Sequence, residues 1–181
     1  MDSMLHCCGE LGYRRVTVEH VYRHFGGYRG LFYKHFRNKA DCFIAAYEAE
    51  ADWLYAQLAR AAARGMRRQE IQVALETLAA YVVEQPTRAK AIFCEVHIAG
   101  ADALGKRREV LERLSRALDS ACRDTRSRHS PPPITAEFMV CVIDQAVSSA
   151  LVAGRPEQFA QDLPELTALI CQVYGDVEPA S

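Results

Sequence analysis

The sequence lacks the features that mark most enzymes, disulfide-stabilised proteins and membrane proteins. It contains no GxSxG, no HExxH and no glycine loop after a strand, so we predict neither an enzyme nor a cofactor. Its seven cysteines are scattered and never spaced as CxxC, which argues against a disulfide framework and a structural zinc site. No apolar run approaches bilayer length, and the N-terminus does not resemble a signal peptide. We therefore expect a cytoplasmic protein without membrane association or bound metal.

Strand-like alternation of apolar and polar residues is also nearly absent, which predicts an all-α fold. Half of the 181 residues are hydrophobic, enough for a sizeable core. Long helices are predicted over residues 87–100, 135–153 and 156–174. The segment 124–134 contains three prolines among polar residues and is predicted to be a loop.

Charge is distributed unevenly, although the formal net charge is only −1. Residues 1–40 contain seven Lys or Arg and three Asp or Glu, whereas the other 141 residues contain 15 and 20. A basic end on an acidic body favours a polyanionic partner at that end.

The basic end includes the stretch TVEHVYRHFGGYRGLFYKHFRNKADCF, residues 17–43, which predicts two short helices joined by a glycine turn. Thr17 suits the N-cap of the first helix, and Gly26 suits the turn. The inward face of the first helix would contain Val18, Val21, Tyr22 and Phe25. Phe32 and Phe36 would anchor the second helix in the core. Such a helix-turn-helix can place its second helix in the major groove of DNA.

This stretch resembles the DNA-binding signature of the TetR family of bacterial transcriptional regulators. The residues that match in type and spacing are Thr17, Gly26, Gly30, Phe32, Tyr33, His35, Phe36, Asn38 and Lys39. The resemblance implies an all-α fold with a three-helix DNA-binding domain, assigned to residues 1–47. A larger helical ligand-binding and dimerisation domain would follow, assigned to residues 48–181.

The resemblance also assigns roles to residues of the helix-turn-helix. Phosphate contacts would come from Thr17, Tyr33, His35 and Lys39. Contacts with bases would come from Arg29, Gly30, Leu31 and Lys34, with Tyr28 at the start of the same surface.

The sequence departs from the family pattern around the turn. The family usually has alanine where Tyr22 and Phe25 stand, an apolar residue at Gly27, and Ser or Thr at Tyr28. Tyr28 cannot cap the second helix as a short hydroxyl side chain would.

In the second half, polar groups on otherwise apolar helices are candidates for a ligand site. These candidates, with their apolar neighbours, are Tyr81, Phe93, Glu95, His97, Met139, Asp144 and Gln145. Surface or interface roles remain open for each. Cys94 and His97 share a helix face, but without a second pair of ligands they do not predict a metal site.

The last two helices are candidates for a homodimer interface, with an intramolecular core as the alternative. The proposed interface residues are Phe138, Val142, Ala146, Ala150, Leu166 and Ile170. We therefore predict a homodimeric, ligand-responsive repressor that binds a two-fold symmetric double-stranded DNA operator and an unknown small-molecule effector. The alternative is a dimer of the same fold that has lost specific DNA binding and binds small molecules or proteins. An enzyme is the remote third possibility.

Overall fold

The computed structural model describes residues 1–62, 67–122, 131, 132 and 134–174, and these residues contain helices and no strand. The all-α prediction is confirmed. The helices are α1 (Asp2–Leu11), α2 (Val18–His24), α3 (Arg29–His35), α4 (Lys39–Ala62), α5 (Arg67–Glu84), α6 (Pro86–Phe93), the 3-10 helix η1 (Glu95–Ile98), α7 (Ala101–Cys122), α8 (Ile134–Val152), α9 (Pro156–Gln161) and α10 (Leu163–Tyr174). Most of the predicted loop at 124–134 lies outside the described residues.

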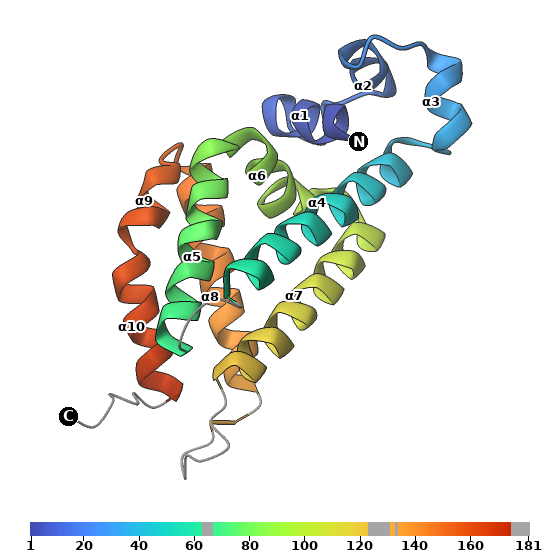
Figure 1. Ribbon diagram of the computed structural model, residues 1–181. Coiled ribbons are helices and arrows are strands. Elements are labelled where there is room, and N and C mark those ends of the chain that lie inside the picture. Colours follow the sequence, from blue (N-terminus) through green and yellow to red (C-terminus); the bar gives the residue numbers. More distant parts are fainter. Residues whose placement is uncertain (63–66, 123–130, 133, 175–181) are drawn as a thin grey trace, which may run out of the picture.

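The molecule has a small end and a larger body (Figure 1). Helices α1–α3 form the small end, and α4 runs from it into the body, where it packs on α5 and α7. Helix α8 packs on α6, α7 and α9, and α10 packs on α5. Because α4 is continuous from residue 39 to 62, it crosses the predicted domain boundary at residue 47 and belongs to both parts.

Two of the predicted long helices are interrupted. The segment 87–100 breaks at Cys94, where the chain continues as a 3-10 turn and the Ser148 hydroxyl donates to the Phe93 carbonyl. The segment 156–174 divides at Asp162, since Pro164 has no N–H and its ring would clash with the carbonyl four residues earlier in a continuous helix.

Helix α8 also corrects the expectation that no apolar run approaches bilayer length. Its 19 residues have a mean hydropathy of 1.4, which is long and apolar enough to cross a membrane by composition alone. In the structure α8 packs against three helices of the body, and its other face is exposed. A core or interface helix of a globular protein passes the same test, so α8 is weak evidence for a membrane span.

The small end is attached to the body mainly through the packing of α1 on α6. Gly9 is buried at this contact, and a Cβ added there would lie 2.0 Å from the Thr87 carbonyl oxygen. Below this contact, Met4, Leu5 and Cys8 are fully buried in the main core, which also contains Phe43 of α4. Glycine at position 9 therefore sets how closely the two helices approach.

We expect Gly9→Ala to lower the free energy of unfolding by about 1–3 kcal/mol, because the added methyl group must push backbone against backbone. Chemical denaturation followed by circular dichroism measures this change. Gly105→Ala on α7 is the matched control. Its Cβ would meet no atom within 4 Å, and we expect it to stabilise the helix by about 0.5–1 kcal/mol. Equal effects of the two substitutions would contradict the close-approach role of Gly9.

Candidate DNA-binding surface and ligand cavity

Local hydrogen bonds build the helix-turn-helix. The His20 N–H donates to Thr17 Oγ1 at 3.3 Å and the Thr17 N–H donates to His20 Nδ1 at 3.2 Å, which completes a capping box at the start of α2. At the end of α2, the Gly27 N–H donates to the Tyr22 carbonyl and the Gly26 N–H to the Arg23 carbonyl. Gly26 has a φ of +73°. This is a Schellman motif, and it ends α2 and turns the chain toward α3.

Helix α3 lies on the surface and is anchored by Phe32, which is 2% exposed, with Phe36 half-buried beside it. The predicted DNA-contacting residues on α3 that are exposed are Arg29, Gly30, Tyr33, Lys34 and His35, whereas Leu31 is half-buried. The Arg29 guanidinium lies 5.5 Å from the centre of the Tyr33 ring. The structure therefore brings these residues together on the outer side of one short helix.

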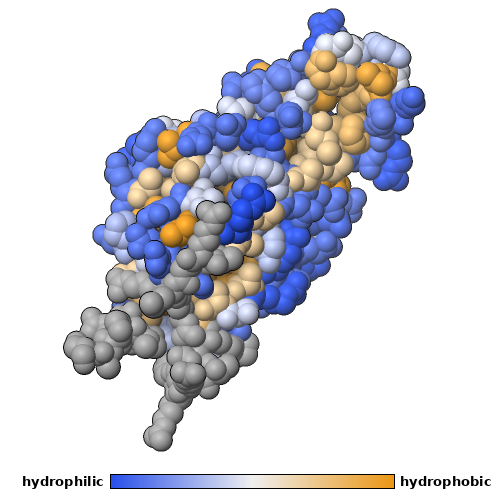
Figure 2. All heavy atoms as spheres, viewed as in Figure 1, coloured by the Kyte–Doolittle hydropathy of each residue, from blue (hydrophilic) through white to orange (hydrophobic). Residues whose placement is uncertain are grey.

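Two exposed aromatic rings lie against the glycines that follow the turn. A Cβ at Gly27 would lie 1.9 Å from the Phe25 ring, and a Cβ at Gly30 would lie 3.0 Å from the Tyr28 ring. Tyr28 is 67% exposed and makes no cap hydrogen bond, as its side chain predicted. Phe25, predicted to face inward, is 44% exposed, because it is the C-cap residue and its ring lies over the turn. Figure 2 shows hydrophobic residues at the surface of the end that α2 and α3 form.

The Lys39 side chain, which was predicted to contact a DNA phosphate, forms hydrogen bonds within the protein. Its Nζ donates to the carbonyl oxygens of Tyr13 at 2.9 Å and Val16 at 3.0 Å, and it lies 4.2 Å from the centre of the Tyr13 ring. Asn38 caps α4 through Oδ1, which accepts from the Asp41 N–H at 2.9 Å. The Lys39 ammonium therefore ties the start of α4 to the turn between α1 and α2.

Hydrogen bonds also connect the small end to α6 and η1. Glu95 of η1 accepts from the Tyr13 N–H at 2.6 Å, and the Thr87 hydroxyl donates to Glu10 at 2.9 Å. Arg88 of α6 pairs with Asp2 of α1 at 3.3 Å and with the buried carboxylate of Glu50 on α4.

Tyr81 donates to the same Glu50 carboxylate at 2.8 Å. Burial and the adjacent Glu50 carboxylate raise the pKa of the Tyr81 phenol, so it remains a donor at neutral pH.

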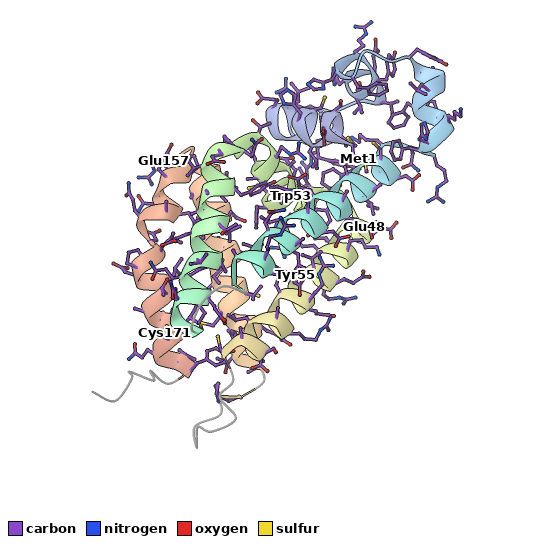
Figure 3. All side chains as sticks on the ribbon, in the orientation of Figure 1. Met1, Glu48, Trp53, Tyr55, Glu157 and Cys171 are labelled. Carbon is purple, nitrogen blue, oxygen red and sulfur yellow. The ribbon has the colours of Figure 1, made fainter. Side chains whose placement is uncertain are left out.

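The body contains an apolar cavity of about 190 Å³ between α4, α5, α7, α8 and α10. Its wall includes Leu54, Leu58, Leu75, Leu111, Leu114 and Leu118. Along α7 the lining extends from Leu111 to Ala121, or about 15 Å at 1.5 Å per residue. Tyr55 also lines it and lies on the opposite side of α4 from Trp53 (Figure 3). The shape and lining suit an elongated apolar ligand.

One end of the cavity wall carries an ion pair. Asp144 of α8 lines the cavity, and its Oδ2 accepts from Nη2 of Arg107 on α7. Both side chains are nearly nine-tenths buried. Burial raises the pKa of the Asp144 carboxyl, an effect that Arg107 and His97 only partly oppose.

Of the seven predicted ligand residues, the structure places Phe93 and Asp144 on the cavity wall. The other five lie elsewhere. Tyr81 and Glu95 form the hydrogen bonds described above, His97 is exposed on η1, and Met139 packs against a second hydrophobic cluster near α10. Gln145 is exposed on α8 and donates to the Ser149 hydroxyl at 3.1 Å.

The ligand site predicted from polar residues did not include the leucines that form most of the cavity wall. The leucine stripe on α7 indicates a buried helix face, because Leu111, Leu114 and Leu118 recur opposite a charged face, but the stripe does not distinguish a cavity wall from a filled core.

The predicted interface residues divide between surface and core. Phe138 is 59% exposed and Val142 is 42% exposed, and with Ile134, Cys141, Gln145, Ser149 and Val152 they form one exposed stripe along α8. Ala146 and Leu166 are half-buried. Ala150 and Ile170 are buried within the protomer, and Ile170 is only 1% exposed, so their side chains fill its own core.

The small end is a three-helix unit that contains a helix-turn-helix, a motif whose second helix can enter the major groove of DNA. Comparison with known proteins agrees. Residues 5–46 match the family described as bacterial regulatory proteins, tetR family. The resemblance seen in the sequence is therefore confirmed, and the chain carries the N-terminal domain of that family. No curated protein matches the chain significantly.

Two solved structures have closely similar folds. The fatty acid degradation regulator FadR from Bacillus halodurans superposes with a TM-score of 0.83 over 98% of this chain and 97% of that chain. The transcriptional regulator FadR from Bacillus subtilis, in complex with stearoyl-CoA, superposes with a TM-score of 0.82 over 93% and 94%. Each is 14% identical to this chain, so the likeness establishes the fold.

We expect Lys39→Met to lower the free energy of unfolding by about 2 kcal/mol, because hydrogen bonds that involve a charged group contribute about 1.5–3 kcal/mol. Lys34→Met removes the same charge from the exposed face of α3, where Lys34 makes no hydrogen bond or ion pair with the described residues. Its expected change is within about 0.5 kcal/mol. Urea titration of both variants measures the difference. If Lys39→Met leaves the free energy of unfolding unchanged, this lysine would serve DNA binding alone.

Proposed function

We propose that the protein is a ligand-responsive repressor that binds a two-fold symmetric DNA operator as a homodimer in the cytoplasm, and that it is not an enzyme. The observation that carries the proposal is that one helix, α4, belongs to both sites. The exposed basic face of α3 lies at one end, and an apolar cavity lies in the body. Helix α4 belongs to both parts, since Lys39 is bonded to the α1–α2 turn and Leu54 lines the cavity.

The proposed DNA-binding surface uses α3 for base contacts and its neighbours for phosphates. Arg29 and Lys34 are exposed and unpaired by acids in the described structure, so they are available to guanine edges and phosphates. Thr17 lies at the exposed N-terminus of α2, where free N–H groups favour a phosphate. Lys39 contributes indirectly, by fixing the turn that positions Thr17.

The proposed effector is a molecule with a long apolar chain that occupies the cavity. The leucine-lined wall supports this, as does the similar fold of the Bacillus subtilis regulator, whose structure contains stearoyl-CoA. Phe93 lines the cavity and ends α6, while α6 and the following η1 bond to Asp2, Glu10 and Tyr13 of the small end. A ligand that displaces Phe93 would therefore shift the contacts that orient α1. The population with two α3 helices matched to successive major grooves would then fall.

The proposed dimer forms through the exposed stripe of α8 and the neighbouring face of α10. Ile134, Phe138 and Val142 would be unusual on a solvated surface, and Leu169 of α10 is 40% exposed. Pairing α8 and α10 with those of a second copy would bury these side chains in a four-helix bundle. Two DNA-binding ends would then be related by a two-fold axis, as a symmetric operator requires.

The second candidate is a dimer that has lost specific DNA recognition and serves as a binding module. It is favoured by one observation, namely that the exposed Tyr28 ring lies against Gly30 and occupies the bare helix surface that could approach DNA. The two candidates differ in whether binding to the promoter of the protein's own gene exceeds binding to a scrambled sequence.

We expect Arg29→Ala/Lys34→Ala to weaken promoter binding at least ~30-fold, since each base contact contributes about 1–3 kcal/mol. Fluorescence anisotropy at two salt concentrations, with scrambled competitor, measures this loss and the number of phosphate contacts. Arg108→Ala/Arg116→Ala removes two exposed positive charges from α7 and is the matched control, with binding unchanged. If wild-type protein binds promoter and scramble equally, the repressor proposal fails and the binding module is favoured.

We expect Phe138→Asp to convert the dimer to a monomer, because a carboxylate would be buried without a partner in the four-helix bundle. Sedimentation equilibrium measures the association. Leu104→Asp is the control, since Leu104 is an exposed apolar residue of α7 and lies outside the proposed α8–α10 interface. A Phe138→Asp variant that dimerises as tightly as wild type would exclude this face as the interface.

A further inference from the structure

An exposed tyrosine ring lies at the start of the helix that the proposed function places against DNA. Tyr28 is the N-cap residue of α3, and its side chain is 67% exposed and makes no cap hydrogen bond. Among the residues that the structure describes, no aromatic ring and no cation packs on the Tyr28 ring. Tyr33 differs in this respect, since Phe32 packs against its ring and the Arg29 guanidinium lies 5.5 Å from its centre. The apolar area of the Tyr28 ring is therefore available for a partner.

The first turn of α3 holds this ring in place. The Tyr28 carbonyl oxygen accepts from the N–H groups of Leu31 at 3.0 Å and Phe32 at 3.3 Å, and Phe32 is buried in the core. One edge of the ring lies against Gly30, because a Cβ built there would be 3.0 Å from Tyr28 Cε2 and 3.4 Å from Cδ2. Gly30 and Arg29 are exposed, so the ring lies on the same outer surface of α3 as these two residues.

The position of the ring suits contact with base edges. In a helix-turn-helix, the N-terminal residues of the second helix are the ones that contact bases in the major groove. The apolar group that a base presents there is the 5-methyl group of thymine, which apolar and aromatic side chains contact. The Tyr28 ring offers such a surface directly beside Arg29, whose guanidinium suits guanine.

We propose that Tyr28 is a specificity-determining residue that reads thymine through its 5-methyl group, and that each half-site of the operator contains a thymine beside the base that Arg29 contacts. This inference rests on the proposed function as a DNA-binding repressor. One edge of the ring is supported by Gly30, and the exposed remainder of the ring meets the methyl group. The ring then contributes to recognition, whereas in the second candidate function it obstructs the approach of DNA.

The test compares two forms of the promoter of the protein's own gene, one with thymidine and one with deoxyuridine throughout. Uracil keeps the base pairing and the O4 acceptor of thymine and lacks the methyl group. Fluorescence anisotropy with the full chain, in the presence of scrambled competitor, measures both affinities. We expect the uracil form to bind at least ~4-fold more weakly, since the burial of one methyl group contributes about a factor of four in affinity.

Two substitutions of Tyr28 then assign the discrimination to the ring. Tyr28→Phe keeps the ring and removes the hydroxyl, so we expect the ratio of the two affinities to be preserved. Tyr28→Ser removes the ring and supplies a hydroxyl that can cap α3, so the variant should fold and bind the two forms of DNA equally. Trp53→Ser is the matched control, because it removes an exposed aromatic ring from the part of α4 in the body and should leave the ratio unchanged.

The possible failures are distinguishable. If the wild type binds the thymine promoter no more tightly than the scramble, the proposed function fails and the inference fails with it. If the wild type prefers the promoter but binds its uracil form equally well, the inference is wrong and the repressor proposal stands. If Tyr28→Ser discriminates as strongly as the wild type, or Tyr28→Phe loses the discrimination, the apolar ring of Tyr28 does not read the methyl group.

Discussion

The close packing of α1 on α6 is the contact on which the arrangement of the two parts depends. It is possible because Gly9 presents no side chain to the Thr87 carbonyl. Around this point, α6 and η1 contribute Arg88, Thr87 and Glu95 to hydrogen bonds or ion pairs with the first helix and the turn after it. The helix that carries these contacts is only eight residues long, and its last residue lines the cavity. Helix α6 therefore connects the wall of the cavity to the contacts that hold the small end.

Polar groups reinforce this junction at different depths. Glu50 is buried on α4, and its charge is balanced by Arg88 and a hydrogen bond from Tyr81. Removing one partner would leave a buried charge without compensation, which costs more than the pair contributes. Lys39 acts similarly at the start of α4, where it satisfies two carbonyl oxygens that the α1–α2 turn leaves open. Hydrogen bonds act over short distances and are directional, so these contacts specify one orientation of the small end relative to the body.

Much of this structure could be predicted from local sequence signals. The Thr17 N-cap, the Gly26 turn and the Asn38 cap follow from residue types with strong positional preferences, and the structure contains all three. The break at Cys94 could not be predicted in this way, because the Phe93 carbonyl there is bonded to Ser148, which is distant in sequence. The division before Pro164 was predictable from the missing N–H, and the predicted continuous helix was wrong.

The cavity was harder to predict than the DNA-binding surface. Buried leucines that fill a core and leucines that line a cavity have the same helical periodicity, so the sequence does not separate them. The polar residues that seemed to indicate a site were instead used to join helices, as Tyr81 and Glu95 show. Asp144 was the exception, since it has both roles. It pairs with Arg107 and lines the cavity.

The aromatic rings beside the turn show how side-chain volume is shared between positions. Members of the family usually have a small residue where Phe25 stands and a larger apolar one where Gly27 stands, and here the two sizes are exchanged. The Phe25 ring occupies the space that a side chain at position 27 would need. The exposed Phe25 ring must therefore move before position 27 can carry a side chain, whereas a smaller residue at position 25 would free that space. A side chain at position 27 should therefore be tolerated better together with a smaller residue at position 25 than alone.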